Sequence, residues 1–405
     1  MSRVRTYGSV IGSAVVPTTT GASGVFDITT AAVETRSNTW VGTTPVTTIS
    51  LPTSQQTGGF VDTYQSTYFN YYGIRAQRNF FEDGVFYVTE TLHSGTTGVT
   101  STSIEGTAST RNGTLVAVLG QRTSVPYQPG VYLYKQKSNF GYSQIGFYSL
   151  TSLNAINIAE ATIAFNPSGS LLAARGSFDG STYSVIIFNT SAETLSYVTT
   201  LTPGGTTYCL DWSSDGQYLA VGTSVSPYLN IYSVSGTTFT QVSGTTITPS
   251  TGGVRSIKFA PTNNDFVLTN YNNPANLRTY NITGNTVTLL SNLSYPASLP
   301  VNGPVSSLTW SSATLFAGCY DSTLTTYYPV FFSKSGNTVT PLGQQSTLGN
   351  PDKISFSPGG EYVFVGYANM PGNIYAMSGS TIGNMCWPTG SINGSTYKSV
   401  TWFKR

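Results

Sequence analysis

The chain has 405 residues and a formal net charge of +2, and only 8% of its residues are charged, against roughly 25% in an average soluble domain. Its 27 tyrosines and 20 phenylalanines are too many for a disordered chain. No run of about 18 apolar residues is present to span a bilayer. No basic stripe is present to bind nucleic acid. The composition favours a rigid β protein with a polar, uncharged surface.

Residues 1–55 lack the repeat found further along, and we interpret them as an N-terminal arm. Within the arm, Asp27 or Thr29 can cap a short amphipathic helix that ends at Arg36. A single short helix is not stable by itself in water. We therefore expect it to dock on the rest of the chain or on another chain.

The arm also contains a segment, residues 23–40, that begins Ser-Gly-Val-Phe and runs through alanine, glutamate and arginine to a tryptophan. It resembles a short element of structural proteins of tailed bacteriophages. The resemblance implies a virion protein whose arm attaches to the particle, with Val25, Phe26, Arg36 and Trp40 as anchoring residues.

Residues 56–104 are rich in aromatic and β-branched residues, which favour strands. Three strands are predicted, at 67–72, at 84–91 and near 99–104. They precede the first full repeat, so they are available to pair with another part of the chain.

From residue 105 onward one pattern returns: a strand ending in an aromatic residue, a turn of Pro, Ser, Asp, Asn or Gly, and a second apolar strand. A looser copy has Ser109 at the aromatic position. The predicted repeats are residues 105–155, 156–202, 203–248, 249–300, 301–346 and 347–394. The repeated aromatic residues are Phe165, Trp212, Phe259, Trp310, Phe356 and Trp402.

Two further short strands follow each pair, so each repeat predicts a four-stranded blade of a β-propeller. The inner strands also resemble those of WD-repeat proteins, as in the sequence WSSDGQYLAVG of residues 212–222. The last repeat stops after its first strand, at residues 399–405. Pairing of this strand with the N-terminal strands would remove an exposed edge. We predict an all-β fold, a seven-bladed propeller over residues 56–405, with six blades as the alternative.

Catalytic groups are scarce in the sequence. The single histidine, His93, excludes histidine-based metal clusters. Paired carboxylates are conceivable, since Asp179, Asp211, Asp215, Asp321 and Glu361 could converge in a ring. Their local contexts explain them more simply, because Asp179 and Asp215 precede glycine, as turn residues do. The repeated aromatic residues are interpreted as packing between blades. We therefore predict a protein that is not an enzyme and that has no cofactor, no metal site and no catalytic residue.

The turns between the second and third strands of the blades offer aromatic residues beside short polar ones, a mixture that suits binding of sugars or protein surfaces. We select them as candidate ligand-binding positions, with chance placement of abundant tyrosines as the alternative. The candidates are Tyr127, Phe178, Asp179, Tyr228, Tyr271, Asn272, Tyr320, Asp321 and Tyr367.

The leading functional hypothesis is a virion structural protein, present as an oligomer or in many copies. Its arm would contact other virion proteins, and its propeller would form a tail-fibre head that binds a host glycan or protein. Capsid decoration or a head fibre is a close variant. The alternatives are a WD-type interaction scaffold and a glycan hydrolase or lyase. No nucleic acid or membrane partner is expected.

Overall fold

The structure is a computed structural model of the 405-residue chain. The chain divides into two units, and all of the described residues lie in the second, residues 59–405. The predicted helix of the arm and the predicted strand at 67–72 fall outside the described residues. The described residues are 74–78, 83–89, 104–121, 129–136, 142–150, 162–176, 184–242, 253–270, 276–294, 305–320, 329–344, 351–367, 373–388 and 397–404.

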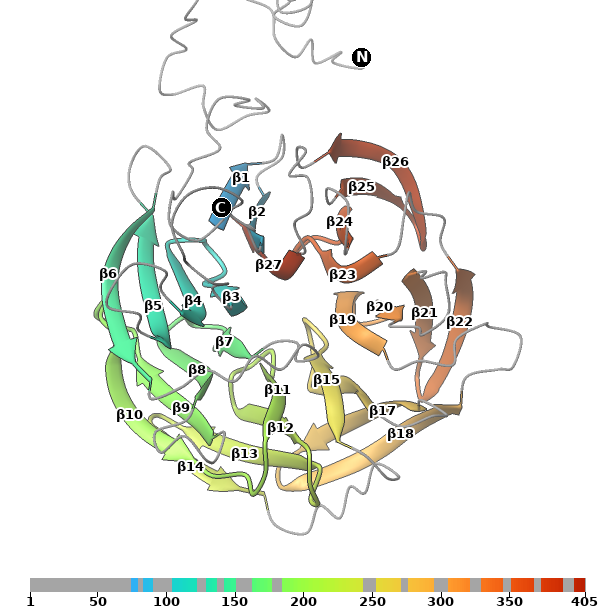
Figure 1. Cartoon of the computed structure of the whole chain (residues 1–405). Helices are drawn as coiled ribbons and strands as arrows, with labels where there is room; N and C mark the ends of the chain where they lie inside the picture. The colour runs from blue at the N-terminus through green and yellow to red at the C-terminus, as the bar shows by residue number, and fades with distance from the viewer. Residues whose placement is uncertain are drawn as a thin grey trace, which may run out of the picture. The chain divides into compact units, whose positions relative to one another are not determined.

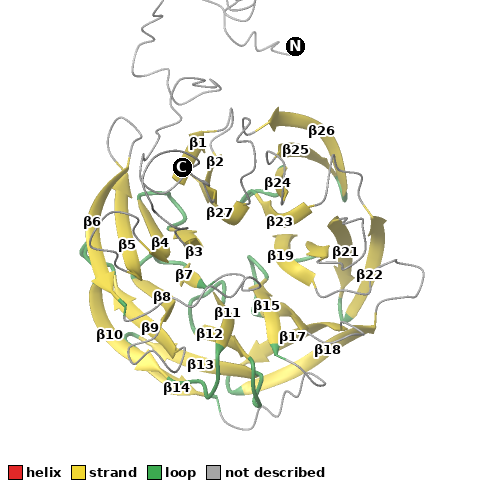
Figure 2. Cartoon of the chain, viewed as in Figure 1, coloured by secondary structure: helices red, strands yellow, loops and turns green. Residues whose placement is uncertain are grey.

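Every regular element in the described part of the chain is a β-strand, and no helix occurs there (Figure 2). That part consequently offers no helix with the length and apolarity to cross a bilayer. The strands are β1 Ile74–Arg78, β2 Asp83–Thr89, β3 Ile104–Ser109, β4 Leu115–Gln121, β5 Pro129–Gln136, β6 Tyr142–Ser149, β7 Ile163–Phe165, β8 Leu171–Gly176, β9 Ser184–Asn189, β10 Ser196–Leu201, β11 Thr207–Trp212, β12 Tyr218–Thr223, β13 Leu229–Ser235, β14 Thr238–Gln241, β15 Val254–Phe259, β16 Asp265–Asn270, β17 Asn276–Thr283, β18 Thr286–Ser294, β19 Val305–Ser312, β20 Leu315–Tyr320, β21 Pro329–Ser335, β22 Thr338–Gln344, β23 Pro351–Phe356, β24 Tyr362–Tyr367, β25 Asn373–Ser378, β26 Thr381–Pro388 and β27 Tyr397–Lys404.

The strands form antiparallel sheets in which chain neighbours pair, as in the order β11-β12-β13-β14. Among the described residues, six sheets have four strands, and one has three in the order β1-β2-β27. Each four-stranded sheet corresponds to one of the predicted repeats. The prediction of an all-β, propeller-like fold built from repeated four-stranded sheets is confirmed.

The first strands of the sheets lie around a common centre (Figure 1). They contact one another in the cyclic order β3, β7, β11, β15, β19, β23 and β27, and β27 contacts β3. The outer strands, such as β6, β18 and β26, lie farthest from this centre. The C-terminal strand β27 pairs with β2, with Trp402 opposite Val85, so the predicted pairing of the two chain ends is present.

Both faces of each central strand are buried, which explains the nearly continuous apolar runs in the second strand of the repeats. In β12 alternate residues point to opposite faces. Tyr218 and Ala220 pack in the core shared with the following sheet. Leu219 and Val221 pack in the core shared with the preceding sheet. The apolar cores therefore lie between adjacent sheets, and a single sheet cannot bury its own faces.

The repeated aromatic residues lie between sheets, as predicted, and none is more than 9% exposed. The three tryptophans also bind the preceding sheet through their indole N–H groups. Trp212 Nε1 donates to the Ala164 carbonyl oxygen at 3.1 Å, and Trp402 Nε1 donates to that of Ser355 at 3.1 Å. Trp310 Nε1 donates to the Lys258 carbonyl oxygen at 2.9 Å. Each indole thus fills an apolar gap and satisfies a backbone carbonyl of its neighbour.

The turn after β11 shows how the predicted turn residues act. Gly216 has a φ of +73°, a conformation that L side chains rarely adopt. Asp215 Oδ1 accepts hydrogen bonds from Ser213 Oγ at 2.6 Å and from the Gln217 N–H at 2.9 Å. Its Oδ2 accepts from Asn264 Nδ2 of the following sheet at 2.8 Å. The carboxylate therefore closes its own turn and links two sheets.

Replacing Asp215 by asparagine should cost about 0.5–1 kcal/mol at neutral pH, because this exposed position keeps two acceptor contacts and loses the third. Burial alone raises the pKa of Asp215, but the hydrogen bonds from Ser213, Asn264 and Gln217 lower it overall. A lowered folded pKa stabilises the fold above the unfolded value of 3.8, and this contribution disappears as the pH falls through the folded pKa. Urea unfolding of both proteins should show a difference near neutrality that vanishes in acid. A difference that grows in acid would contradict this assignment.

Candidate functional site: the central pocket

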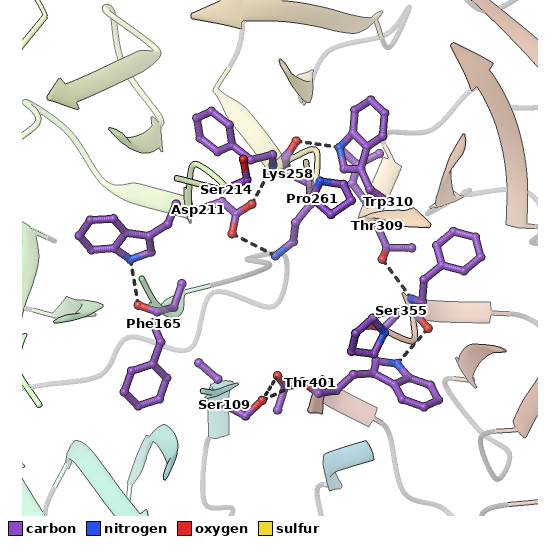
Figure 3. Close-up of a pocket in the computed structure, with 18 of the residues that line it drawn as sticks. Ser109, Phe165, Asp211, Ser214, Lys258, Pro261, Thr309, Trp310, Ser355 and Thr401 are labelled. Atoms are coloured by element: carbon purple, nitrogen blue, oxygen red, sulfur yellow. Dashed lines mark hydrogen bonds and ion pairs between the residues drawn. The ribbon is translucent and has the colours of Figure 1, made fainter. Parts of the chain in front are cut away.

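The first strands enclose a pocket of about 380 Å³ at the centre of the sheets, a volume within the usual range for small-molecule sites. All seven of them contribute lining residues, together with the turns that follow several of these strands. Figure 3 shows the pocket, with side chains from the whole ring of strands directed around it. A ligand in this pocket would therefore contact residues that are far apart in the sequence.

The residue immediately before each repeated aromatic lines this pocket, and its side chain points to the opposite face of the strand from the aromatic ring. In β11, Trp212 bonds to the preceding sheet, whereas Asp211 points toward the following one. Asp211 Oδ2 accepts the backbone N–H of Phe259 at 2.8 Å. In the corresponding place of β19, the Thr309 hydroxyl accepts the N–H of Phe356 at 3.1 Å. One oxygen of Asp211 is thus used to join sheets.

The other oxygen of Asp211 faces a cation. Lys258 Nζ lies 3.6 Å from Asp211 Oδ1 (Figure 3), and the two side chains are 30% and 17% exposed. Arg111 and Lys353 also line the pocket, and Asp211 is the one carboxylate among its described lining residues. Among the described lining residues, cationic side chains therefore outnumber carboxylates.

The pKa of Asp211 is raised from its usual value of 3.8 because the carboxyl group is buried. Lys258 and the backbone N–H groups of Phe259 and Trp212 lower the pKa but do not cancel the effect of burial. A carboxyl group whose pKa is raised holds a proton more readily than an exposed one does, which suits it to accept and return a proton.

Other polar groups of the pocket wall serve mainly to join neighbouring strands. Ser109 Oγ donates to the Trp402 carbonyl oxygen at 2.9 Å and lies 2.9 Å from Thr401 Oγ1. Ser307 Oγ donates to the Ile354 carbonyl oxygen at 3.2 Å and accepts the Ile354 N–H at 3.1 Å. These hydroxyls hold the wall in place. Asp211 and Lys258, in contrast, form a pair of oppositely charged groups that face each other in the pocket.

Tyr228, the one selected turn residue whose side chain is described, is not among the residues that line this pocket. Tyr228, just before β13, is half-buried and packs against the core cluster that contains Leu229 and Ile231. Tyr320 and Tyr367 are the last residues of β20 and β24. The proposed loop-binding function stays a prediction. Outside the described residues lie Tyr127, Phe178, Asp179, Tyr271, Asn272, Asp321, and the anchoring residues Val25, Phe26, Arg36 and Trp40.

Sequence reasoning missed the pair at the centre. Asp211 and Lys258 are 47 positions apart, and nothing in their local context indicates chemistry. A signal was present, because both stand immediately before the repeated aromatic in consecutive repeats. Within the described residues, no group of three or more His, Cys, Asp or Glu side chains is placed to hold a metal ion.

Comparison with known proteins supports the fold. A sequence profile of the WD domain, G-beta repeat, matches residues 196–233. No curated protein sequence matches the chain. A periplasmic gluconolactonase from Pseudomonas aeruginosa is similar in structure, with a TM-score of 0.56, 15% identity, and coverage of 79% of this chain and 95% of that one.

Two further solved structures have the same architecture. A protein from Lactobacillus plantarum gives a TM-score of 0.61 at 13% identity, covering 79% of this chain and 99% of that one. A candidate 6-phosphogluconolactonase from Bacteroides uniformis gives a TM-score of 0.60 at 10% identity, covering 85% and 97%. At such identities the likeness establishes the fold alone, and none of these matches is named as a virion protein.

The prediction that the chain is not an enzyme is wrong, because proteins named as lactonases share this architecture. That prediction relied on the scarcity of histidine and on the absence of paired catalytic residues in the sequence. The arrangement of the first strands brings a carboxylate and an ammonium group from separate repeats into one pocket, a proximity that the linear sequence does not show.

Proposed function

We propose that the protein is a seven-bladed β-propeller that hydrolyses a lactone, or a related ester of a hydroxylated molecule, in its central pocket. The observation that carries this proposal is the Asp211–Lys258 pair in a pocket of small-molecule size. The names of the structural neighbours supply the reaction class. Seven blades are supported by the six four-stranded sheets, the β1-β2-β27 sheet and the cyclic contacts of the first strands.

In the proposed reaction, water adds to the lactone carbonyl carbon while Asp211 Oδ1 accepts a proton from that water. Lys258, 3.6 Å away, stabilises the negative charge that develops on the carbonyl oxygen. The ring C–O bond then breaks, and the leaving oxygen takes the proton from Asp211. The product is an open-chain hydroxy acid, which ionises to a carboxylate.

The test is a pH-stat assay of the full-length protein with a panel of aldonolactones. Asp211→Asn should lower kcat/KM by about 10²–10⁴-fold, the usual contribution of a general base. The asparagine side-chain oxygen can still accept the Phe259 N–H, so the fold should persist. Lys258→Met should also reduce activity strongly.

The matched control is Glu193→Gln, which changes an exposed carboxylate that pairs with Lys135 away from the pocket lining. It should leave kcat/KM unchanged. Failure of the wild-type protein to turn over any lactone of the panel, or full activity of Asp211→Asn, would remove the proposal.

A role on a virus particle is a second proposal, which is compatible with hydrolysis. It rests on the resemblance of residues 23–40 to an element of tailed-phage proteins. An arm over residues 1–55 would attach to the particle, and the propeller over 56–405 would be displayed toward the host. A chain lacking residues 1–50 should then fail to incorporate into particles, whereas normal incorporation would exclude the arm as the anchor.

A further inference from the structure

We infer that the central pocket binds an oxyanion at Lys258 and that Asp211 takes up a proton as the anion binds. The inference rests on the central pocket being the binding site of the proposed function, and it names the ligand chemistry of that site. Carboxylate, sulfate and phosphate groups share this chemistry, and the product of the proposed hydrolysis carries a carboxylate.

The described wall of the pocket carries more cationic side chains than carboxylates, which favours an anionic ligand. Arg111, Lys258 and Lys353 line the pocket with Asp211 as the one described carboxylate. Lys258 is 30% exposed, so its ammonium group can be reached from the pocket. An anion is therefore attracted to this wall, in a space where low exposure strengthens the attraction.

An ionised Asp211 would repel the same anion, unless the carboxyl group takes up a proton as the anion binds. Because Asp211 Oδ1 lies 3.6 Å from Lys258 Nζ, an oxyanion at the ammonium group would be close to an ionised carboxylate. The repulsion would be of the same order as the attraction. A protonated Asp211 would instead donate a hydrogen bond to the anion through Oδ1, while Oδ2 still accepts the Phe259 N–H.

The surroundings of Asp211 make it the proton acceptor. The strands packed against β11 are β7, β12 and β15. Strand β7 carries no titratable side chain, β12 carries Tyr218, and β15 carries Arg255 and Lys258. Tyr218 donates its hydroxyl to the Gly284 carbonyl oxygen, and Lys258 is the charged group that pairs with Asp211. Burial already favours the neutral form of this carboxyl and raises its pKa.

The experiment is isothermal titration calorimetry of the full-length protein with sulfate, whose own charge is constant across the range used. The affinity should rise as the pH falls, by at most tenfold for each pH unit, because a single carboxyl group takes up at most one proton. Titrations in two buffers of different ionisation enthalpy should report an uptake that approaches one proton for each sulfate bound.

Three variants at Asp211 and Lys258, with a fourth as a control, separate the contributions of the two side chains. Asp211→Asn should bind sulfate without pH dependence and without proton uptake, at the affinity that the wild-type protein reaches in acid. Lys258→Met should lose binding at every pH, whereas Lys258→Arg should retain it. Glu193→Gln, an exposed position outside the pocket lining, should behave as the wild type does.

Sulfate affinity that is independent of pH in the wild-type protein, absence of binding at every pH, or unchanged binding by Lys258→Met would each overturn the inference. Its failure is distinguishable from that of the proposed function. Proton-linked sulfate binding without lactone turnover would remove only the hydrolase proposal. Lactone turnover without proton-linked binding would remove only this inference.

Discussion

Removal of residues 397–405 should abolish the cooperative unfolding transition of the protein or lower its stability by more than about 5 kcal/mol. Strand β27 pairs with β2 along its length and contacts the first strands β3 and β23. It also carries Trp402, whose ring is 8% exposed and whose loss alone should cost about 3–5 kcal/mol. Without β27, strand β2 would present an unpaired edge, which promotes association with other chains.

Thermal unfolding and size-exclusion chromatography with light scattering would measure this effect. A synthetic peptide of residues 395–405 should restore the monomer and part of the stability, because it can occupy the vacant strand position. Removal of Arg405 alone is the matched control and should have no effect. A truncated protein that stays monomeric with unchanged stability would show that β27 is not needed to close the fold.

Replacement of Trp310 by alanine should lower the free energy of unfolding by about 3–5 kcal/mol. The ring is 8% exposed and contacts Phe316 with centroids 4.7 Å apart. Its indole N–H donates to the Lys258 carbonyl oxygen at 2.9 Å. The substitution would therefore leave a cavity between two sheets and a backbone carbonyl without its donor. Because this carbonyl belongs to Lys258, sulfate or substrate binding in the central pocket should weaken as well.

Two further variants separate the effect of the cavity from the effect of the lost hydrogen bond. Trp310→Phe keeps most of the ring volume, and phenylalanine already stands at this position of other repeats, as in Phe259 and Phe356. It should cost only about 0.5–1.5 kcal/mol for the lost hydrogen bond. Tyr197→Ala, at a ring that is 50% exposed, should change stability by about 0.5 kcal/mol or less. Equal losses for all three variants in chemical denaturation would contradict the assigned role of the indole.

The candidate site was less predictable than the fold. The sequence pattern that places Trp212 and Trp310 between sheets recurs in successive repeats. Such recurrence indicates a role in packing. Asp211 and Lys258 break the pattern of the position that they share, because the corresponding residues are Thr309 in β19 and Thr401 in β27. Such a departure becomes informative only when the repeats are known to converge, since the local sequence around each residue is that of an ordinary strand end.

The sequence by itself determined the repeated unit, its turns and its buried strands, because backbone conformation at Gly216 and alternation along β12 depend on residues only a few positions apart. It also indicated that the last strand needs a partner. Only the tertiary structure decided that this partner is β2, and that Asp211 meets Lys258 in the central pocket. Contacts between sheets join residues about 47 positions apart, and their geometry depends on how all the sheets pack around one centre.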